Sequence, residues 1–134
     1  MFRTLLVTGL CLASLPALAQ KYEATLNTAQ EVPPKTSSGN GTATMTLDGN
    51  KLTYEVTYKD LTGPATAAHI HGPAEPGANA GVMVPFSNPA TPIKGTVDLT
   101  PDQISNLKAG KEYVNVHTQQ NPGGEIRGQI KPAS

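Results

Sequence analysis

All three histidines of the chain fall in two short segments that alternate like β-strands. His69 and His71 occur in Ala-His-Ile-His-Gly-Pro, and His117 occurs in Tyr-Val-Asn-Val-His-Thr. Side chains two positions apart on a strand share a face, so His69 and His71 point the same way while Ile70 points to the opposite face. A His-x-His strand of this kind has the geometry to chelate one metal ion.

The segment that carries His117 follows the same alternation. Val114 and Val116 are its natural core residues, which places Tyr113, Asn115 and His117 on the other side of the strand. If Ile70 also faces the core, all three histidines project from the outer surface of the domain. Long loops are then available to cover them, and the third ligand comes from a neighbouring strand.

Three imidazoles without a thiolate suit copper or zinc best, with one coordination position open to water or substrate. Histidines on a surface are also common as hydrogen-bonded polar residues. The competing hypothesis is therefore a polar cluster that only fixes the loops.

Other polar residues are candidates for roles beside the metal. In the last predicted strand, Glu125, Arg127 and Gln129 alternate with Ile126 and Ile130 and are expected to face outward. Arg127 is the only arginine after residue 19, and its planar fork of donors suits a small anion that is attracted or oriented beside a metal. It is equally suited to pairing with Glu125. Glu31, Asn115 and Glu125 are the candidates for alternative ligands or for residues that orient the ligands.

Period-2 alternation dominates the rest of the chain and predicts half-buried strands. Tyr22, Ala24 and Leu26 alternate with polar residues. Two longer runs on either side of Asp48-Gly49-Asn50 predict a β-hairpin. Gly, Pro and Asn clusters separate the further predicted strands, which are residues 67–71, 81–86, 93–99, 112–118 and 125–130.

One short helix is expected between strands. Thr100-Pro101-Asp102-Gln103 combines an N-cap residue, a proline at the first helical position and a glutamine three residues after the cap, and Gly110 ends the segment. Many short strands joined by turns indicate an all-β fold, an antiparallel Greek-key sandwich or barrel of the immunoglobulin-like or superoxide-dismutase-like kind, with this one helix.

The first 19 residues are typical of a secretory signal peptide. A charge at Arg3 precedes an apolar run, and Ala17-Leu18-Ala19 provides small residues for cleavage after Ala19. The run is shorter than the ~20 residues of a membrane-spanning helix, and no other segment is a candidate span. We therefore expect one exported domain, residues 20–134, in the periplasm or outside the cell.

Composition narrows the function classes further. Cys11, the only cysteine, lies inside the signal, so the mature domain has neither disulfides nor thiolate chemistry. The chain has ten acidic and ten basic side chains with no basic stripe, which makes nucleic acid an improbable partner.

Four blocks of the sequence resemble the signature of the CHRD (chordin-repeat) domain, in the same order. They are Ala29-Gln30-Glu31-Val32-Pro33-Pro34, Ala68-His69-Ile70-His71-Gly72-Pro73, Tyr113-Val114-Asn115-Val116-His117-Thr118 and Gly124-Glu125-Ile126-Arg127-Gly128-Gln129. The resemblance covers nearly all of the mature chain. It implies a single-domain exported protein of the bacterial type.

A second, weaker similarity concerns chemistry. A His-x-His strand, a Val-x-Val-His strand and a Gly-Gly-x-x-Arg-Gly segment follow the order of the copper ligands and active-site arginine in Cu/Zn superoxide dismutases. The similarity implies copper on His69, His71 and His117, with Arg127 steering superoxide. A fourth copper histidine, a bridging histidine, a zinc cluster and a disulfide are missing, so it extends to a copper-only version at most.

Two classes of function follow. The first is an exported metal-binding β-sandwich, which would be an oxidoreductase like superoxide dismutase if the bound copper changes oxidation state. The second is a non-catalytic module that binds an extracellular protein or matrix partner and uses its histidines structurally. Replacing His71 distinguishes them, because only the first predicts loss of metal binding.

Overall fold

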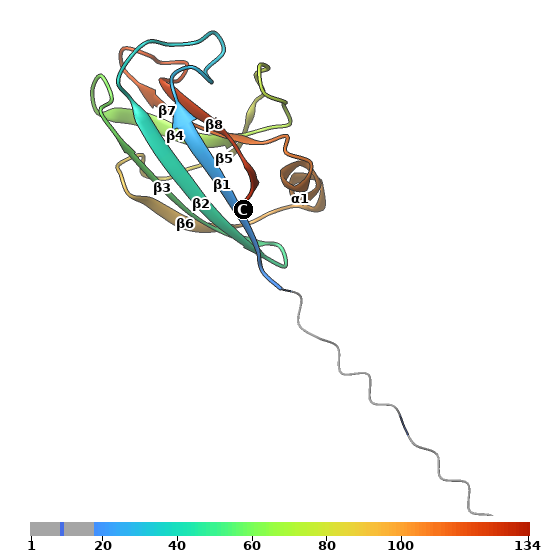
Figure 1. Cartoon of the computed structure of the whole chain (residues 1–134). Helices are drawn as coiled ribbons and strands as arrows, with labels where there is room; N and C mark the ends of the chain where they lie inside the picture. The colour runs from blue at the N-terminus through green and yellow to red at the C-terminus, as the bar shows by residue number, and fades with distance from the viewer. Residues whose placement is uncertain (1–8, 10–17) are drawn as a thin grey trace, which may run out of the picture.

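The computed structural model describes Gly9 and residues 18–134 (Figure 1). The signal peptide predicted for residues 1–19 therefore lies almost entirely outside the described residues. Among those described, no helix is long and apolar enough to cross a membrane.

The described chain folds as strands with one helix, as expected for an all-β domain. The elements are β1 (Gln20–Asn27), β2 (Asn40–Asp48), β3 (Lys51–Lys59), β4 (Ala65–His71), β5 (Val82–Pro85), β6 (Ile93–Asp98), α1 (Pro101–Lys108), β7 (Tyr113–Thr118), β8 (Ile126–Gln129) and β9 (Lys131–Pro132). Most predicted strands are confirmed and some are a residue shorter at each end. The two-residue strand β9 was not predicted.

The strands form one antiparallel sheet that curls into a nearly closed barrel. Their order is β5-β4-β7-β8-β1-β2-β3-β6, and β9 also pairs with β1. Strands that are distant in sequence pair at β4–β7, β8–β1 and β3–β6, as in a Greek key. The curl brings β4, β5, β7 and β8 into one layer and β1, β2, β3 and β6 into the other (Figure 1).

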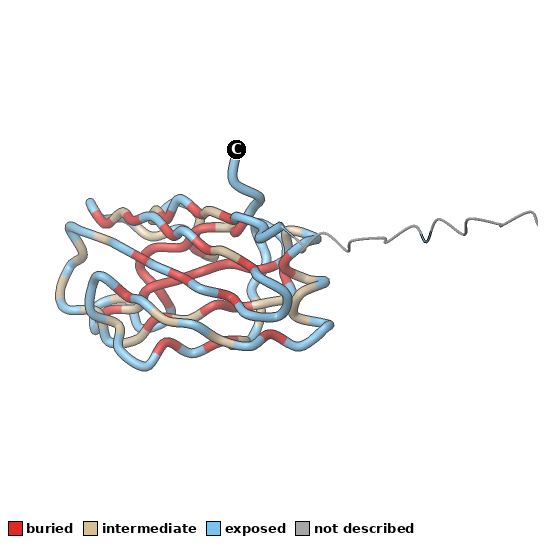
Figure 2. Tube along the Cα trace, turned by 90° about the horizontal axis from the view of Figure 1, so that it is seen from below, coloured by how far each residue is buried: buried red, intermediate tan, exposed pale blue. Residues whose placement is uncertain are grey.

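The core lies between these two layers (Figure 2). Each strand sends alternate side chains inward, for example Leu26 on β1, Val56 on β3 and Ile70 on β4, all with no exposed area. The predicted alternation is thus confirmed for both layers. The side chains between the inward positions point out of the barrel, and on β4, β7 and β8 these are the residues of the candidate site.

Two predicted local structures are confirmed in detail. The β2–β3 hairpin pairs Asp48 with Lys51, so Gly49 and Asn50 form a two-residue loop. Gly49 has φ +61°, which suits glycine at the first position of such a loop. Helix α1 begins with a complete capping box, in which the Thr100 side chain accepts from the Gln103 backbone and the Gln103 side chain accepts from the Thr100 backbone.

One carboxylate lies in the core without a partner. Glu112 is 1% exposed, and neither of its carboxylate oxygens has a hydrogen-bond partner among residues 18–134. Burial raises the pKa of this carboxyl to about 7 because the charged form loses its hydration. Ionisation of Glu112 therefore destabilises the folded protein.

We expect Glu112→Gln to stabilise the protein at pH 8 by about 2–3 kcal/mol and to have little effect at pH 4.5. The folded-state pKa is raised, so the stability of the wild type is greatest below the unfolded pKa and falls as pH rises through the folded pKa near 7. Urea unfolding at both pH values measures this difference. Glu55→Gln on the exposed surface is the control, and a Glu112→Gln variant that loses stability at pH 8 would contradict the assignment.

Candidate metal centre

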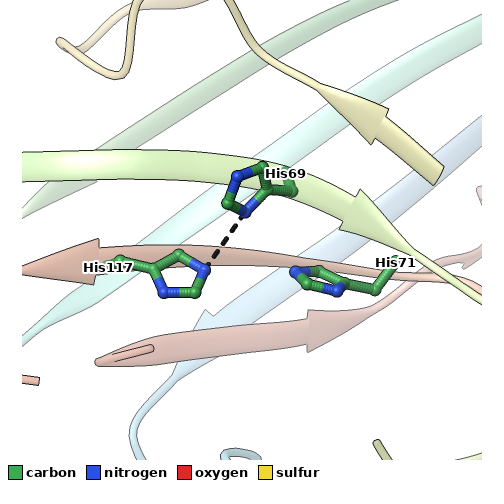
Figure 3. Close-up of side chains that lie close together, drawn as sticks. All are labelled: His69, His71 and His117. Carbon is green, nitrogen blue, oxygen red and sulfur yellow. Dashed lines mark hydrogen bonds between the residues drawn. The ribbon is translucent and has the colours of Figure 1, made fainter. Parts of the chain in front are cut away.

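The site lies on the outer face of the layer that contains β4, β7 and β8. β4 pairs with β7 in a register that sets His69 opposite Asn115 and Ala67 opposite His117. This register brings His69, His71 and His117 together, as the sequence predicted. One ring nitrogen from each histidine lies within 4.8 Å of those of the other two. Figure 3 shows the three rings facing one shared space.

Two of the three rings make hydrogen bonds to backbone carbonyl groups. His71 Nδ1 lies 3.0 Å from the carbonyl oxygen of Ala80. His117 Nδ1 lies 2.8 Å from that of Pro122. A carbonyl oxygen only accepts, so each Nδ1 must carry the proton and donate it. In the neutral ring, Nε2 then holds the free lone pair.

These Nε2 atoms converge with the third histidine and an amide oxygen. His117 Nε2 lies 3.2 Å from His69 Nδ1. Asn115 Oδ1 lies 2.8 Å from His71 Nε2 and 2.9 Å from His117 Nε2. The lone pairs of the histidine nitrogens and of Asn115 Oδ1 thus point into one small space. The space contains fewer N–H hydrogens than lone pairs, so some lone pairs accept no hydrogen bond.

The surroundings of two of the rings favour their neutral form. Burial lowers the pKa of His71 more than its hydrogen bonds to Ala80 and Asn115 raise it. Burial, followed by the neighbouring histidines, lowers the pKa of His69. An imidazole must be deprotonated to bind a metal ion, so a lowered pKa favours ligation.

Loops cover this face, which the sequence predicted only as a possibility. His71 is 8% exposed and Asn115 is 3% exposed, whereas His69 and His117 are half-buried. The carbonyl groups of Ala80 and Pro122 belong to the loops that follow β4 and β7. The histidines are therefore partly covered by loop backbone, and His69 and His117 keep more exposed surface than His71.

Tyr113 connects the histidines to Arg127. Its ring stacks on His71 with centroids 4.9 Å apart and planes 4° apart. The Arg127 guanidinium carbon lies 3.5 Å from the centroid of the same ring. Since β7 lies between β4 and β8, Tyr113 separates His71 from Arg127. Arg127 contacts Asn79, the Glu75 backbone and Gln129 instead of a histidine.

A comparison with protein families matches residues 22–130 to the CHRD domain. The match begins at the first core residue of β1 and ends at Ile130, and it includes all three histidines. The chain belongs to the CHRD domain family. No solved structure resembles it closely enough to count as a match.

Glu31 lies in the first of the four blocks that resemble the CHRD signature, on the loop after β1. It is 4% exposed, and burial raises the pKa of its carboxyl to about 7 against the lowering effects of Arg127, Asn115 and Lys35. A Cβ added at Gly124 would lie 2.6 Å from Glu31 Oε1 and 2.7 Å from Asn115 Nδ2. The carboxyl group and the amide nitrogen thus meet at Gly124, which leaves the amide oxygen facing the histidines. Glu31 belongs to this CHRD site as a neighbour of Asn115.

Glu125 lies apart from the histidines, contrary to the expectation that it faces outward with Arg127. It is fully buried, and its carboxylate accepts hydrogen bonds from four side chains: Ser37, Thr62, Thr118 and Asn121. Thr118 follows His117 and so faces the other side of β7. The alternation of β8 begins only at Ile126, because the chain turns at Gly124 with φ +124°.

Proposed function

We propose that this CHRD domain binds one transition-metal ion through His69, His71 and His117. The observation that carries the proposal is the convergence of ring nitrogens and the Asn115 amide oxygen, with fewer hydrogens between them than lone pairs. Backbone carbonyls fix the tautomers of His71 and His117, and this is how proteins orient metal-ligating histidines. A cation in the shared space removes the conflict among the lone pairs.

The spacing of the histidines also suits a metal ion. Two nitrogens that each lie 2.0–2.1 Å from an ion in a tetrahedral site are about 3.4 Å apart. His69 Nδ1 and His117 Nε2 are 3.2 Å apart. His71 completes the set after a small movement of its ring, since the three nitrogens lie within 4.8 Å of one another.

Copper is the metal that we assign to the site, with zinc as the alternative. Imidazole binds both, and a given nitrogen site generally holds Cu(II) more tightly than Zn(II). Residues 20–134 contain no cysteine, so the thiolates of a structural zinc site are missing. CHRD domains are typically extracellular, and we propose that this one is exported to the periplasm or beyond.

We assign no reaction to the bound metal. A superoxide dismutase-like role would use Arg127 to guide the anion to copper. Tyr113 lies between that guanidinium and His71, and the three hydrogen bonds of Arg127 go to residues of the covering loop and β8. The placement of Arg127 therefore does not favour superoxide as a substrate.

Titration of the metal-free protein, residues 20–134, tests the proposal. Isothermal calorimetry is expected to show one equivalent of Cu(II) bound, with Zn(II) bound more weakly in the same site and displaced by Cu(II). Absence of binding by both metals would overturn it. The histidines would then be structural, and a protein or matrix partner would be the remaining hypothesis for this exported module.

A further inference from the structure

Asn115 places an amide oxygen among the three histidines. It lies two positions before His117 on β7 and opposite His69 on β4, so its side chain leaves the same face of the sheet as theirs. Asn115 Oδ1 is 2.8 Å from His71 Nε2 and 2.9 Å from His117 Nε2. Both rings use Nδ1–H to donate to a backbone carbonyl, so neither Nε2 carries a hydrogen in the neutral ring. Three acceptor atoms therefore face one another at hydrogen-bond distance.

The orientation of the Asn115 amide is set from its other end. Glu31 is 4% exposed, and its carboxyl oxygens are turned towards Gly124 and Asn115 Nδ2. The amide acts on this carboxyl group as a hydrogen-bond donor. A carboxylate only accepts, so the amide nitrogen faces Glu31 and the amide oxygen faces the histidines. Arg127 is the charge partner of Glu31, and opposite charges at close range favour the ionised form of both.

The distances around Asn115 Oδ1 match those between neighbouring ligands of a tetragonal ion. Two ligand atoms that each lie 2.0–2.1 Å from an ion are about 2.9 Å apart at a right angle and about 3.4 Å apart in a tetrahedron. Both contacts of Oδ1 agree with the right angle. The separation of His69 Nδ1 and His117 Nε2, 3.2 Å, lies between the two values. Tetragonal sets of nitrogen and oxygen ligands are typical of Cu(II).

We infer that Asn115 Oδ1 is the fourth ligand of the metal centre and makes the centre selective for Cu(II) over Cu(I). The inference rests on the proposed three-histidine site and fills the position that three imidazoles leave open. Soft sulfur ligands select Cu(I), whereas an amide oxygen is a hard ligand and suits the more highly charged ion. Glu31 is the positioning residue, because it holds the amide with its oxygen towards the ion.

The competing arrangement is a reversed Asn115 amide, in which Nδ2 donates to the Nε2 atoms of His71 and His117. That arrangement satisfies both rings without a metal ion and leaves the amide oxygen facing Glu31. A bound ion would then have to displace the amide. The two arrangements therefore predict opposite effects of removing the amide, which weakens Cu(II) binding if Oδ1 is a ligand and tightens it if the amide competes with the ion.

Electron–nuclear double resonance tests the ligand directly. The sample is Cu(II)-loaded protein with ¹³C in the side-chain carbonyl of asparagine. We expect a ¹³C hyperfine coupling from a single asparagine in the wild type, and its loss in Asn115→Leu. A wild type that binds Cu(II) through the histidines without this coupling overturns the inference and leaves the proposed function standing. A wild type that binds neither Cu(II) nor Zn(II) overturns both.

Chelator competition, carried out for Cu(II) and, without oxygen, for Cu(I), measures the selectivity. Asn115→Leu keeps a similar side-chain shape without the oxygen. It should weaken Cu(II) binding at least about tenfold and change Cu(I) binding less than about threefold. Glu31→Gln should weaken Cu(II) binding about tenfold, as expected for a residue that orients a ligand, and the exposed control Glu55→Gln should leave it unchanged.

A folded Asn115→Leu protein that binds Cu(II) as tightly as the wild type, or more tightly, overturns the inference. Circular dichroism shows whether the variant keeps the β-fold. If it does not fold, the ¹³C measurement on the wild type decides alone, because that measurement needs no substitution to show whether the Asn115 carbonyl binds the ion.

Discussion

Replacing His71 by alanine is expected to weaken Cu(II) binding at least about 100-fold. Loss of a residue that only orients a metal ligand typically costs 10–100-fold in affinity, and loss of the ligand itself should cost no less. His71 is the most buried of the three histidines, and its hydrogen bond to the Ala80 carbonyl holds its ring in place. Its Nε2 is thus preorganised for the ion. Competition titration against a chelator of known affinity measures the change.

The other variants separate ligation from folding. His69→Ala and His117→Ala should weaken copper binding by a similar factor, whereas Thr57→Ala should leave it unchanged. Circular dichroism shows whether each variant keeps the β-fold. A folded His71→Ala protein that binds copper as tightly as the wild type would remove His71 from the site.

Glu125→Gln is expected to destabilise the folded protein by about 3 kcal/mol at pH 7. Burial alone would raise the pKa of this carboxyl, but hydrogen bonds from Thr62, Thr118 and Ser37 outweigh it and lower the pKa from 4.5 to about 2. Each tenfold change in the acid dissociation constant corresponds to about 1.4 kcal/mol of free energy. A glutamine in its place directs N–H groups at hydroxyl donors and loses the charge that they stabilise.

The direction of the pKa shift also predicts how the stability difference between wild type and Glu125→Gln changes with pH. Because the folded-state pKa is depressed, the stabilisation by Glu125 is complete above the unfolded pKa and is lost as pH falls through the folded pKa. The difference between wild type and variant should therefore be constant from pH 5 to 7 and shrink towards pH 2. Urea unfolding measures it, with Glu55→Gln as the exposed control. Equal stability of both proteins at pH 7 would rule out this role for Glu125.

The side of the sheet on which the histidines lie could be predicted from sequence, because it depends only on the alternation of apolar and polar residues along each strand. Ile70, Val114 and Val116 are all fully buried, and this fixes the side on which the residues between them lie. Glu112 lies two positions before Val114, just outside β7, and is also buried. Its burial was not predicted from the sequence.

The coverage of the site could not be predicted in the same way. The groups that fix the tautomers of His71 and His117 are backbone carbonyls of Ala80 and Pro122, and any residue type has such a carbonyl. The stacking of Tyr113 between His71 and Arg127 depends on strand order, which alternation along one strand does not reveal.

The prediction that Glu125 faces outward was wrong for a different physical reason. Its hydrogen-bond partners Thr62 and Ser37 are 63 and 88 positions away in sequence. The positive φ of Gly124 turns the chain just before β8, so the alternation of that strand does not extend back to Glu125. A sequence pattern carries information about a face only within the strand that it describes.

The central claim, that three histidines bind one ion, is tested most directly by electron paramagnetic resonance. The sample is protein with ¹⁵N-labelled histidine, loaded with one equivalent of Cu(II). We predict hyperfine coupling to three histidine nitrogens in the wild type and to two in any copper that His71→Ala retains. Coupling to fewer than three histidine nitrogens in the wild type, or a spectrum that His71→Ala leaves unchanged, would contradict a copper centre built from His69, His71 and His117.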